Sequence, residues 1–170
     1  MNAVLAAWNI ADESTALGSM LACCGAKRWA SGMVALRPIE SIAKLSEAAD
    51  EVWNSMQEPD FLEAFSCHPR IGERKPAAHA GAQSSAWSSQ EQGQTGAASD
   101  NVLVQIAAGN QRYEELFGFT YIVCATGKSA EEMLRILNRR LASTREAELR
   151  EAAEQQRQIM QIRLGKWLVE

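Results

Sequence analysis

Residues 39–56, with the sequence IESIAKLSEAADEVWNSM, carry a clear helical pattern. Their apolar side chains recur at intervals of three and four residues, which is the spacing that places side chains on one face of an α-helix. This apolar stripe consists of Ile42, Leu45, Ala49, Val52, Trp53 and Met56. Pro38 precedes the stretch, at a position where the start of a helix tolerates proline. The pattern predicts an amphipathic helix over 39–56.

The same reading extends outward to most of the chain. Ala, Leu, Glu, Gln and Arg dominate the composition and runs of β-branched residues are rare, which favours helices. We expect a short helix from Pro59, another over 97–116, a third opened by a capping box at Ser129, and a long last helix from 143–146 to Trp167. The prediction is an all-α fold, a multi-helix bundle.

Two segments depart from this pattern. Residues 74–96 are rich in Ala, Ser, Gln and Gly and predict a long loop with one short helical turn, and loops of this length tend to be functional or disordered. Residues 117–125 have a composition typical of a strand, but no second strand is predicted to pair with them. We therefore expect buried extended chain there.

Length and composition bound the possible functions. A chain of 170 residues with 46% hydrophobic content suits a single domain over 1–170. The net charge of −4 gives no basic surface for nucleic acid. No apolar run reaches the roughly 20 residues that cross a bilayer, and the N-terminus lacks a basic leader. We expect a cytoplasmic protein that binds neither nucleic acid nor a membrane.

Metal and cofactor chemistry is not predicted either. The four cysteines lack a Cys-x-x-Cys spacing, and the two histidines form no paired metal-ligand motif. Gly127-Lys128-Ser129 resembles the end of a phosphate-binding loop, but the position five residues before its Gly-Lys, which should be glycine, is Ile122. We expect no cofactor and no metal, with Ser129 as a helix cap.

His68 is the leading candidate for acid–base chemistry. It lies in the run Ser66-Cys67-His68-Pro69-Arg70-Ile71-Gly72-Glu73, just after the short helix that begins near Pro59. An imidazole exchanges protons near neutral pH, and the following proline restricts the backbone. Arg70 and Glu73 add charges of both signs, either near a substrate or as a pair that braces the turn. The alternative is that the run is an ordinary loop between helices.

A second polar motif lies in the 74–96 segment. Ser88 is followed three residues later by Glu91, which matches a capping box and predicts a helix N-terminus there. Alternatively, Glu91 faces the same cavity as His68. The two interpretations are compatible, and both stay open from the sequence.

Together these motifs resemble the OHCU decarboxylase family, named for 2-oxo-4-hydroxy-4-carboxy-5-ureidoimidazoline, a product of urate oxidation. The resemblance covers nearly the whole chain. It rests on Cys23-Cys24-Gly25 with Trp29, Arg37-Pro38, His68 to Glu73, Ser88-x-x-Glu91-Gln92, Phe117 to Ala125, and Arg163-Leu164. It implies an all-α homodimer that converts OHCU to (S)-allantoin and carbon dioxide without a cofactor. The C-terminal residues Leu168-Val169-Glu170 differ from the peroxisomal Ser-Lys-Leu signal.

The resemblance also implies roles for particular residues. His68, Glu91 and Arg163 would be catalytic, with His68 as the general acid and base. The expected substrate-binding residues are Pro69, Ser88, Ser89, Gln90, Glu91, Gln92, Tyr121, Ile122, Val123, Cys124 and Ala125. Arg163 has a plainer alternative, a solvated arginine on a helix surface.

A different class of function remains open from the sequence. The tryptophan-containing helices and the Ala- and Gln-rich last helix are compatible with a non-catalytic helical module that mediates dimerisation or docking. Such a module has no need for His68, Glu91 and Arg163 to converge on one pocket. Convergence of these side chains on a small molecule would therefore favour the enzyme.

Overall fold

The computed structural model describes residues 2–73 and 77–170. Within these residues the secondary structure is helical, with no strand. The helices are α1 (Ala3–Ile10), α2 (Glu13–Cys23), α3 (Lys27–Ala35), α4 (Ile42–Asn54), α5 (Glu58–Ser66), α6 (Ala82–Glu91), α7 (Asp100–Phe117), α8 (Ala130–Arg140) and α9 (Arg145–Trp167), with a 3-10 turn η1 (Thr95–Ala97). The predicted all-α class is confirmed. Among the described helices, none is both long and apolar enough to cross a membrane.

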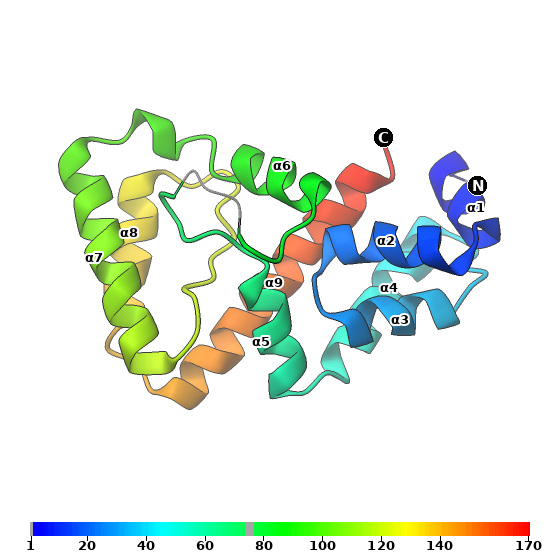
Figure 1. Ribbon diagram of the computed structural model, residues 1–170, viewed down its shortest axis with the longest axis horizontal. Helices are drawn as coiled ribbons and strands as arrows, with labels where there is room; N and C mark the ends of the chain where they lie inside the picture. Colours follow the sequence, from blue (N-terminus) through cyan, green and yellow to red (C-terminus); the bar gives the residue numbers. More distant parts are fainter. Residues whose placement is uncertain (1, 74–76) are drawn as a thin grey trace. The chain divides into compact units, whose positions relative to one another are not determined.

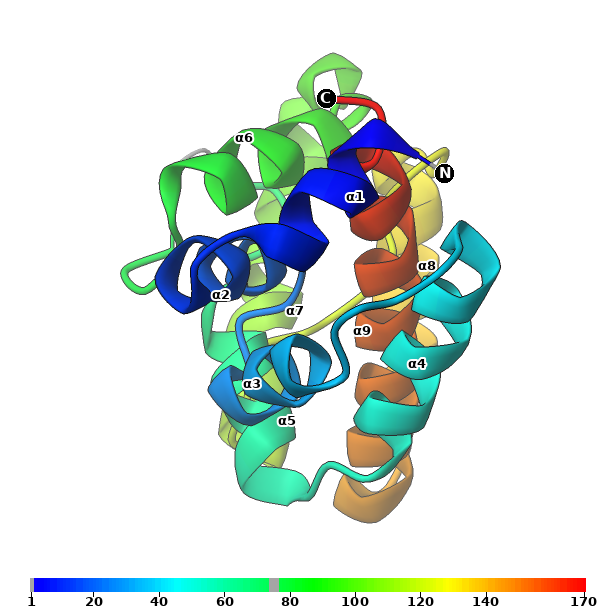
Figure 2. The same cartoon turned by 90° about the vertical axis from the view of Figure 1, so that its right-hand side faces the viewer.

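The chain divides into two compact units, the first made of residues up to Ala64 together with Arg157–Glu170, and the second of Phe65–Gln156. In the first unit α3 packs against both α2 and α4 (Figure 2). The indole of Trp29 is buried and donates a hydrogen bond to the carbonyl of Ala49 at 3.1 Å. Trp8 and Trp167 meet edge to face, with 6.0 Å between ring centroids. These indoles thus tie together segments that are distant in sequence.

The second unit is organised around α7 and α8, which lie side by side (Figure 1). At Gly109 on α7 an added Cβ would lie only 2.5 Å from a methyl carbon of Leu137 on α8, so the glycine permits the close approach. The aromatic rings of Tyr113, Phe117 and Phe119 pack on one another nearby. Gly118 ends α7 with a φ of +79°, a conformation that glycine adopts without strain.

The amphipathic helix predicted over 39–56 is confirmed with shorter bounds, as α4. It begins after Ser41, whose hydroxyl accepts a hydrogen bond from the backbone N–H of Lys44 at 3.1 Å. A capping serine satisfies an otherwise unpaired N–H, so Pro38 lies before the helix and does not start it. Leu45, Ala49 and Trp53 are buried as predicted, whereas the side chain of Ile42, in the first turn, is 49% exposed.

The prediction for residues 74–96 is wrong in part. They contain α6, a helix of ten residues in place of a single turn, while residues 74–76 lie outside the described residues. Ser88 is in the last turn of α6 and does not cap its N-terminus, so the capping-box interpretation is wrong. The buried positions of α6 are Ser84, Trp87 and Ser88. These positions have helical spacing, but two of the three are serines, so the sequence shows no apolar stripe that would predict the helix.

The remaining predictions differ from the structure only at their boundaries. The helix predicted over 97–116 is α7, from Asp100 to Phe117. Of the segment predicted over 117–125 as buried extended chain, Phe117 belongs to α7, and residues 121–125 are buried and outside any helix or strand. Ser129 caps α8 through a hydrogen bond from the N–H of Glu132. The last helix, α9, begins at Arg145 and ends at Trp167, with the hydroxyl of Thr144 accepting a hydrogen bond from the N–H of Ala147.

Candidate active site

The His68 turn, residues 67–73, follows directly on α5, which ends at Ser66. The N–H of His68 still donates to the carbonyl of Phe65 at 3.1 Å, and the N–H of Glu73 donates to the carbonyl of Arg70 at 3.1 Å. Gly72 has a φ of +85°, which favours glycine. The prediction that the histidine lies just past a helix end is confirmed, and the turn is fixed by its own backbone.

His68 is half-buried and contacts α9. Its Nε2 lies 2.7 Å from Oε1 of Gln156, a side chain with 0% exposure. Sequence analysis did not identify Gln156. The signal was present, however, because Gln156 interrupts a run of buried apolar residues at helical spacing on α9, namely Ala152, Ala153, Ile159 and Met160.

The end of α6 is tied to the His68 turn. The side-chain oxygen of Gln92 accepts a hydrogen bond from the N–H of Gly72 at 3.0 Å. A cavity of about 410 Å³ lies beside this contact, and four of the predicted substrate-binding residues line it, namely Pro69, Ser88, Ser89 and Gln92. The structure thus brings together two motifs that are separate in sequence.

Three other predicted residues have different positions. Glu91 is half-buried in the last turn of α6, and neither it nor His68 is among the residues that line this cavity. Gln90 is exposed and does not line it either. The His68 turn therefore borders the cavity through Pro69, Gly72 and Glu73, and not through the side chain of His68.

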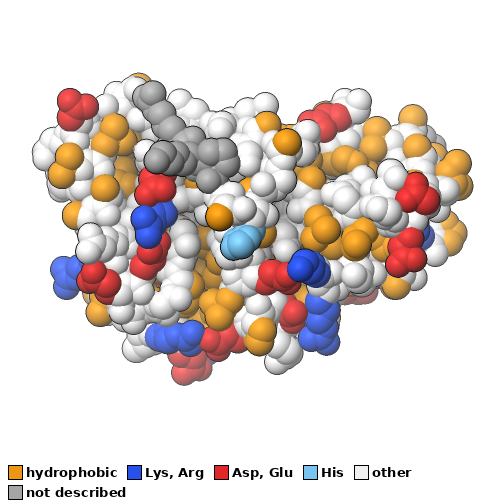
Figure 3. Space-filling model, in the orientation of Figure 1, with side chains coloured by type: hydrophobic (Ala, Val, Ile, Leu, Met, Phe, Trp, Pro, Cys, Tyr) orange, Lys and Arg blue, Asp and Glu red, His pale blue; other side chains and the backbone are white. Residues whose placement is uncertain are grey.

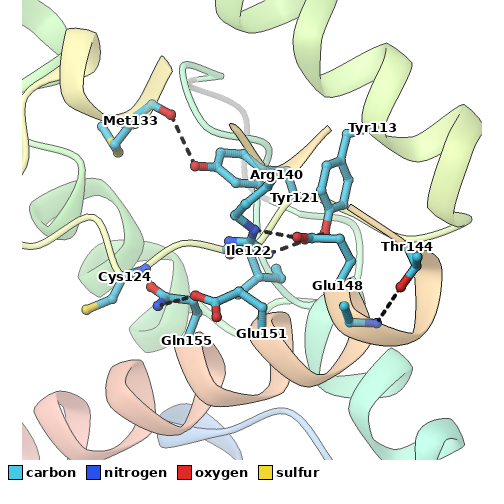
Figure 4. A network of polar contacts seen from close by, with 11 residues as sticks. Tyr113, Tyr121, Ile122, Cys124, Met133, Arg140, Thr144, Glu148, Glu151 and Gln155 are labelled. Carbon is cyan, nitrogen blue, oxygen red and sulfur yellow. Dashed lines mark hydrogen bonds and ion pairs between the residues drawn. The ribbon is translucent and has the colours of Figure 1, made fainter. Parts of the chain in front are cut away.

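The segment 121–125 is held at its backbone by side chains from α8 and α9 (Figure 4). Arg140 donates from Nη1 to the carbonyl of Ile122 at 2.6 Å, and the side-chain oxygen of Gln155 accepts from the N–H of Cys124 at 2.8 Å. Lys128 donates from Nζ to the carbonyl of Cys124 at 2.8 Å. These backbone groups already have hydrogen-bond partners within the protein. A substrate that contacts this segment would therefore bind to other atoms of it, or share a carbonyl oxygen or N–H with the existing partner.

A buried polar network contacts this segment through Arg140 (Figure 4). Arg140 and Glu148 form an ion pair with Nε and Oε2 2.8 Å apart, and both side chains are 3% exposed. The hydroxyl of Tyr113 also donates to Glu148, and the guanidinium of Arg140 lies over the ring of Tyr121. Burial raises the pKa of both tyrosines above the ordinary value, so the two hydroxyls stay protonated at neutral pH.

Arg70 belongs to an exposed network on the same unit. Its guanidinium makes two hydrogen bonds to the carboxylate of Glu114, at 2.7 and 2.6 Å, and one to Glu73 at 3.3 Å. The predicted pairing of Arg70 with Glu73 is confirmed, and Glu114 of α7 is an additional partner. Arg70 therefore joins the His68 turn to α7.

Arg163 lies on the part of α9 that belongs to the first unit. Its side chain is 2% exposed, so the alternative of a solvated surface arginine is wrong. In the same unit, burial raises the pKa of the Cys23 thiol well above its usual range, and the positive charge of Arg163 partly offsets that effect. The thiol stays protonated at neutral pH.

Metal-ligating side chains do not gather in the described part of the chain. Across residues 2–73 and 77–170, no group of three or more His, Cys, Asp or Glu side chains could hold a metal ion. All four cysteines are described, and none of them forms a disulfide. Charges of both signs are interspersed over the face shown in Figure 3, without a large area of one sign.

Comparison with known proteins places the chain in a family. The sequence model of OHCU decarboxylase matches residues 9–165. The chain belongs to the OHCU decarboxylase family. Its structure is similar to the crystal structure of an OHCU decarboxylase in the presence of (S)-allantoin, with a TM-score of 0.76, 30% identity, and coverage of 88% of this chain and 96% of the other. A crystal structure of (S)-allantoin synthase shares the fold, with a TM-score of 0.69 at 18% identity, over 96% of this chain and 53% of the other.

Two curated relatives are longer than this chain. The uric acid degradation bifunctional protein TTL of Arabidopsis thaliana is 34% identical over 145 residues, which cover 85% of this chain and 44% of the relative. The uric acid degradation bifunctional protein PucL of Bacillus subtilis is 25% identical over 136 residues, which cover 80% of this chain and 26% of the relative. The chain thus spans less than half the length of either relative.

Proposed function

We propose that this protein decarboxylates OHCU to (S)-allantoin and carbon dioxide in urate degradation, as a carboxy-lyase without a cofactor. The observation that carries the proposal is the junction of the His68 turn with the end of α6, where Gln92 bonds to Gly72 beside a cavity lined by Pro69, Ser88 and Ser89. Membership of the family supports the choice of substrate. The family model spans both compact units, so we further propose that they form one functional domain over 1–170.

The reaction needs an electron sink and a proton donor. When the C–C bond to the substrate carboxylate breaks, carbon dioxide leaves and the electron pair forms a double bond from the hydroxyl-bearing carbon to the ureido-bearing carbon, while the imine nitrogen takes up a proton. The hydroxyl of this enol then loses its proton and becomes a ring carbonyl, and one proton is added to the neighbouring, ureido-bearing carbon to give allantoin. The protein's tasks are to orient the carboxylate, stabilise the developing negative charge and deliver the proton to one face.

His68 is the proposed proton handler. Its half-buried imidazole is held at the end of α5 and contacts a buried side chain, so the ring has a defined orientation. A positioned general acid or base typically contributes about 10²–10⁴-fold to the rate. We expect His68→Ala to lose turnover by this factor while it stays folded, as measured by the decay of OHCU generated in situ from urate. Unfolding of the variant would instead indicate a structural histidine.

Glu91 is proposed to accept hydrogen bonds from the ureido or ring N–H groups of the substrate, since an ionised carboxylate only accepts. Its place in the last turn of α6, next to Gln92, supports this role. Glu91→Gln should chiefly raise KM, because it replaces an acceptor oxygen with a donor. Glu115→Gln, the same change at an exposed position in the last turn of α7, is the matched control. Equal effects of the two substitutions would argue against a specific role for Glu91.

Arg163 is proposed to bind the substrate carboxylate or a carbonyl oxygen through its planar guanidinium. Arg163 and Gln156 are seven residues apart on α9, about two helical turns, and both are buried. Arg163→Lys keeps the charge but loses the bidentate geometry, so we expect a higher KM and a lower turnover. Unchanged values of both would remove Arg163 from the site.

The competing function is a non-catalytic helical interaction module, and the activity of the wild type decides between the two. A well-folded protein that does not accelerate OHCU decay would favour the module. The homodimer and the cytoplasmic location implied by the resemblance stay predictions. Sedimentation equilibrium of the full chain would test the dimer.

A further inference from the structure

Gln156 is an unusual residue at its position in α9. Its side chain is completely buried, and its neighbours three and four positions away along the helix are Ala152, Ala153, Ile159 and Met160, all buried and apolar. A leucine or methionine would suit such a stripe better, since burying an amide costs free energy unless its polar atoms are hydrogen-bonded.

The amide satisfies only one of its two polar ends within the described residues. Its Oε1 lies 2.7 Å from Nε2 of His68, whereas its own Nε2 has no hydrogen-bond partner there. An unpaired buried donor lowers stability. Gln156 thus combines an unsatisfied buried donor with a contact to His68, and an unsatisfied buried polar group is a feature that can mark a functional role.

We propose that Gln156 is a positioning residue that holds the imidazole of His68 in the tautomer protonated on Nε2, so that Nδ1 is the nitrogen that exchanges a proton with the substrate. A side-chain carbonyl can only accept, so the ring nitrogen facing it must carry the hydrogen. The bond partner of one ring nitrogen thus decides the role of the other. This inference rests on the proposed function of His68.

The first test replaces the amide with an apolar side chain of similar size. Gln156→Leu should lose turnover by roughly 10–100-fold, as when the hydrogen-bond partner of a metal-bound histidine is removed, with KM unchanged if Gln156 acts only through His68. Its midpoint in urea should be equal to or higher than that of the wild type. Gln105→Leu, the same change at an exposed position of α7, is the matched control and should leave turnover and KM unchanged.

A merely structural glutamine would give the opposite result. The Gln156→Leu variant would then have a lower midpoint in urea but the turnover of the wild type. That outcome would overturn the inference.

The second test needs no variant. The chain has two histidines, so nitrogen-15 NMR of the imidazole rings gives two sets of signals, with the exposed His79 as an internal reference. In the neutral ring of wild-type His68 we expect the hydrogen on Nε2. A hydrogen on Nδ1 would mean that the amide of Gln156 donates instead, and it would overturn the inference even if Gln156→Leu fails to fold.

The two proposals fail in different ways. If the wild type does not accelerate OHCU decay, the proposed function fails. If the wild type is active, His68→Ala is inactive and Gln156→Leu keeps full turnover, only the role of Gln156 fails.

Discussion

Two arginine–glutamate pairs of the second unit have similar nitrogen–oxygen distances and opposite environments. Arg140 and Glu148 are 2.8 Å apart and almost completely buried, whereas Arg70 and Glu114 are 2.6 Å apart with side-chain exposures of 48% and 26%. Each pair holds an element of the candidate site. Arg140 bonds to the backbone of the segment 121–125, and Arg70 joins the His68 turn to α7.

The environment decides what each pair contributes. In a buried pair, removal of one partner leaves an uncompensated charge in a medium that solvates it poorly, at a cost of about 3–5 kcal/mol. In an exposed pair, water and salt screen the attraction, and the contribution is typically about 0.2–1 kcal/mol. The segment 121–125 should therefore be fixed firmly, while the His68 turn depends more on Gln92 and Gln156 than on Arg70.

The largest effect should come from Glu148→Leu. The substitution leaves the guanidinium of Arg140 buried without its anion, so the free energy of unfolding should fall by about 3–5 kcal/mol. Urea denaturation measures the change. Glu146→Leu, at an exposed position two residues earlier on α9, is the control and should stay within about 0.5 kcal/mol of the wild type. A loss below about 1 kcal/mol for Glu148→Leu would contradict the account.

The double variant Arg140→Met with Glu148→Leu sharpens the comparison. Neither charge is then buried alone, so we expect it to be about 1–4 kcal/mol more stable than Glu148→Leu. Turnover of OHCU should stay below that of the wild type, because the carbonyl of Ile122 loses its bond to Arg140. If the losses of the two single variants simply add, the two residues are not coupled.

The buried network should also make stability depend on alkaline pH. Burial raises the pKa of Tyr113 and Tyr121 above the ordinary value of 10.0, and these are the only tyrosines of the chain. For an acid whose pKa is higher in the folded state, the stabilisation is complete below the unfolded pKa and is lost as pH rises above it. The urea midpoint should therefore fall above about pH 10, with tyrosinate absorbance appearing only on unfolding. Tyrosinate formation at pH 10 in the folded protein would contradict this.

Arg70→Ala should have a smaller effect, a loss of about 0.2–1 kcal/mol at low ionic strength. High salt screens exposed charges, so the difference from the wild type should shrink in concentrated sodium chloride. Urea denaturation at two salt concentrations measures it. A loss near that of Glu148→Leu would mean that exposure does not explain the difference between the two pairs.

Arg150→Ala should have the smallest effect. Arg150 pairs with Glu146 one turn earlier on α9, and both side chains are more than two-thirds exposed. Such pairs contribute about 0.3–0.5 kcal/mol. This variant gives the baseline for an ion pair that holds no part of the site, and turnover should not change. A loss of turnover would contradict the assumption that Arg150 lies outside the active site.

Local sequence patterns predicted the features that local interactions determine. The stripe of α4, the cap at Ser129 and the end of α5 just before His68 each depend on residues within a few positions of one another. Buried chain outside any strand was predicted over 117–125 from its composition and the absence of a partner strand, and residues 121–125 fit this prediction, whereas Phe117 belongs to α7. These features need no knowledge of the tertiary structure.

The features that were missed depend on tertiary packing. α6 is rich in serine and weakly amphipathic, so helix propensity alone does not favour it. Its Trp87 is buried, and such tertiary packing provides most of the stability of a short helix. Gln156 and Arg140 act through contacts with residues 88 and 18 positions away in the sequence. Their burial is visible only once the helices are packed, although a polar residue within an apolar stripe is a usable signal.

The most direct test of the proposed function is the stereochemistry of the product. OHCU generated in situ from urate decays without catalysis to racemic allantoin, so circular dichroism during the reaction reports enzymatic proton delivery to one face. We predict fast formation of (S)-allantoin by the wild type and no such signal with His68→Ala. A folded wild type that yields only racemate at the uncatalysed rate would contradict the account.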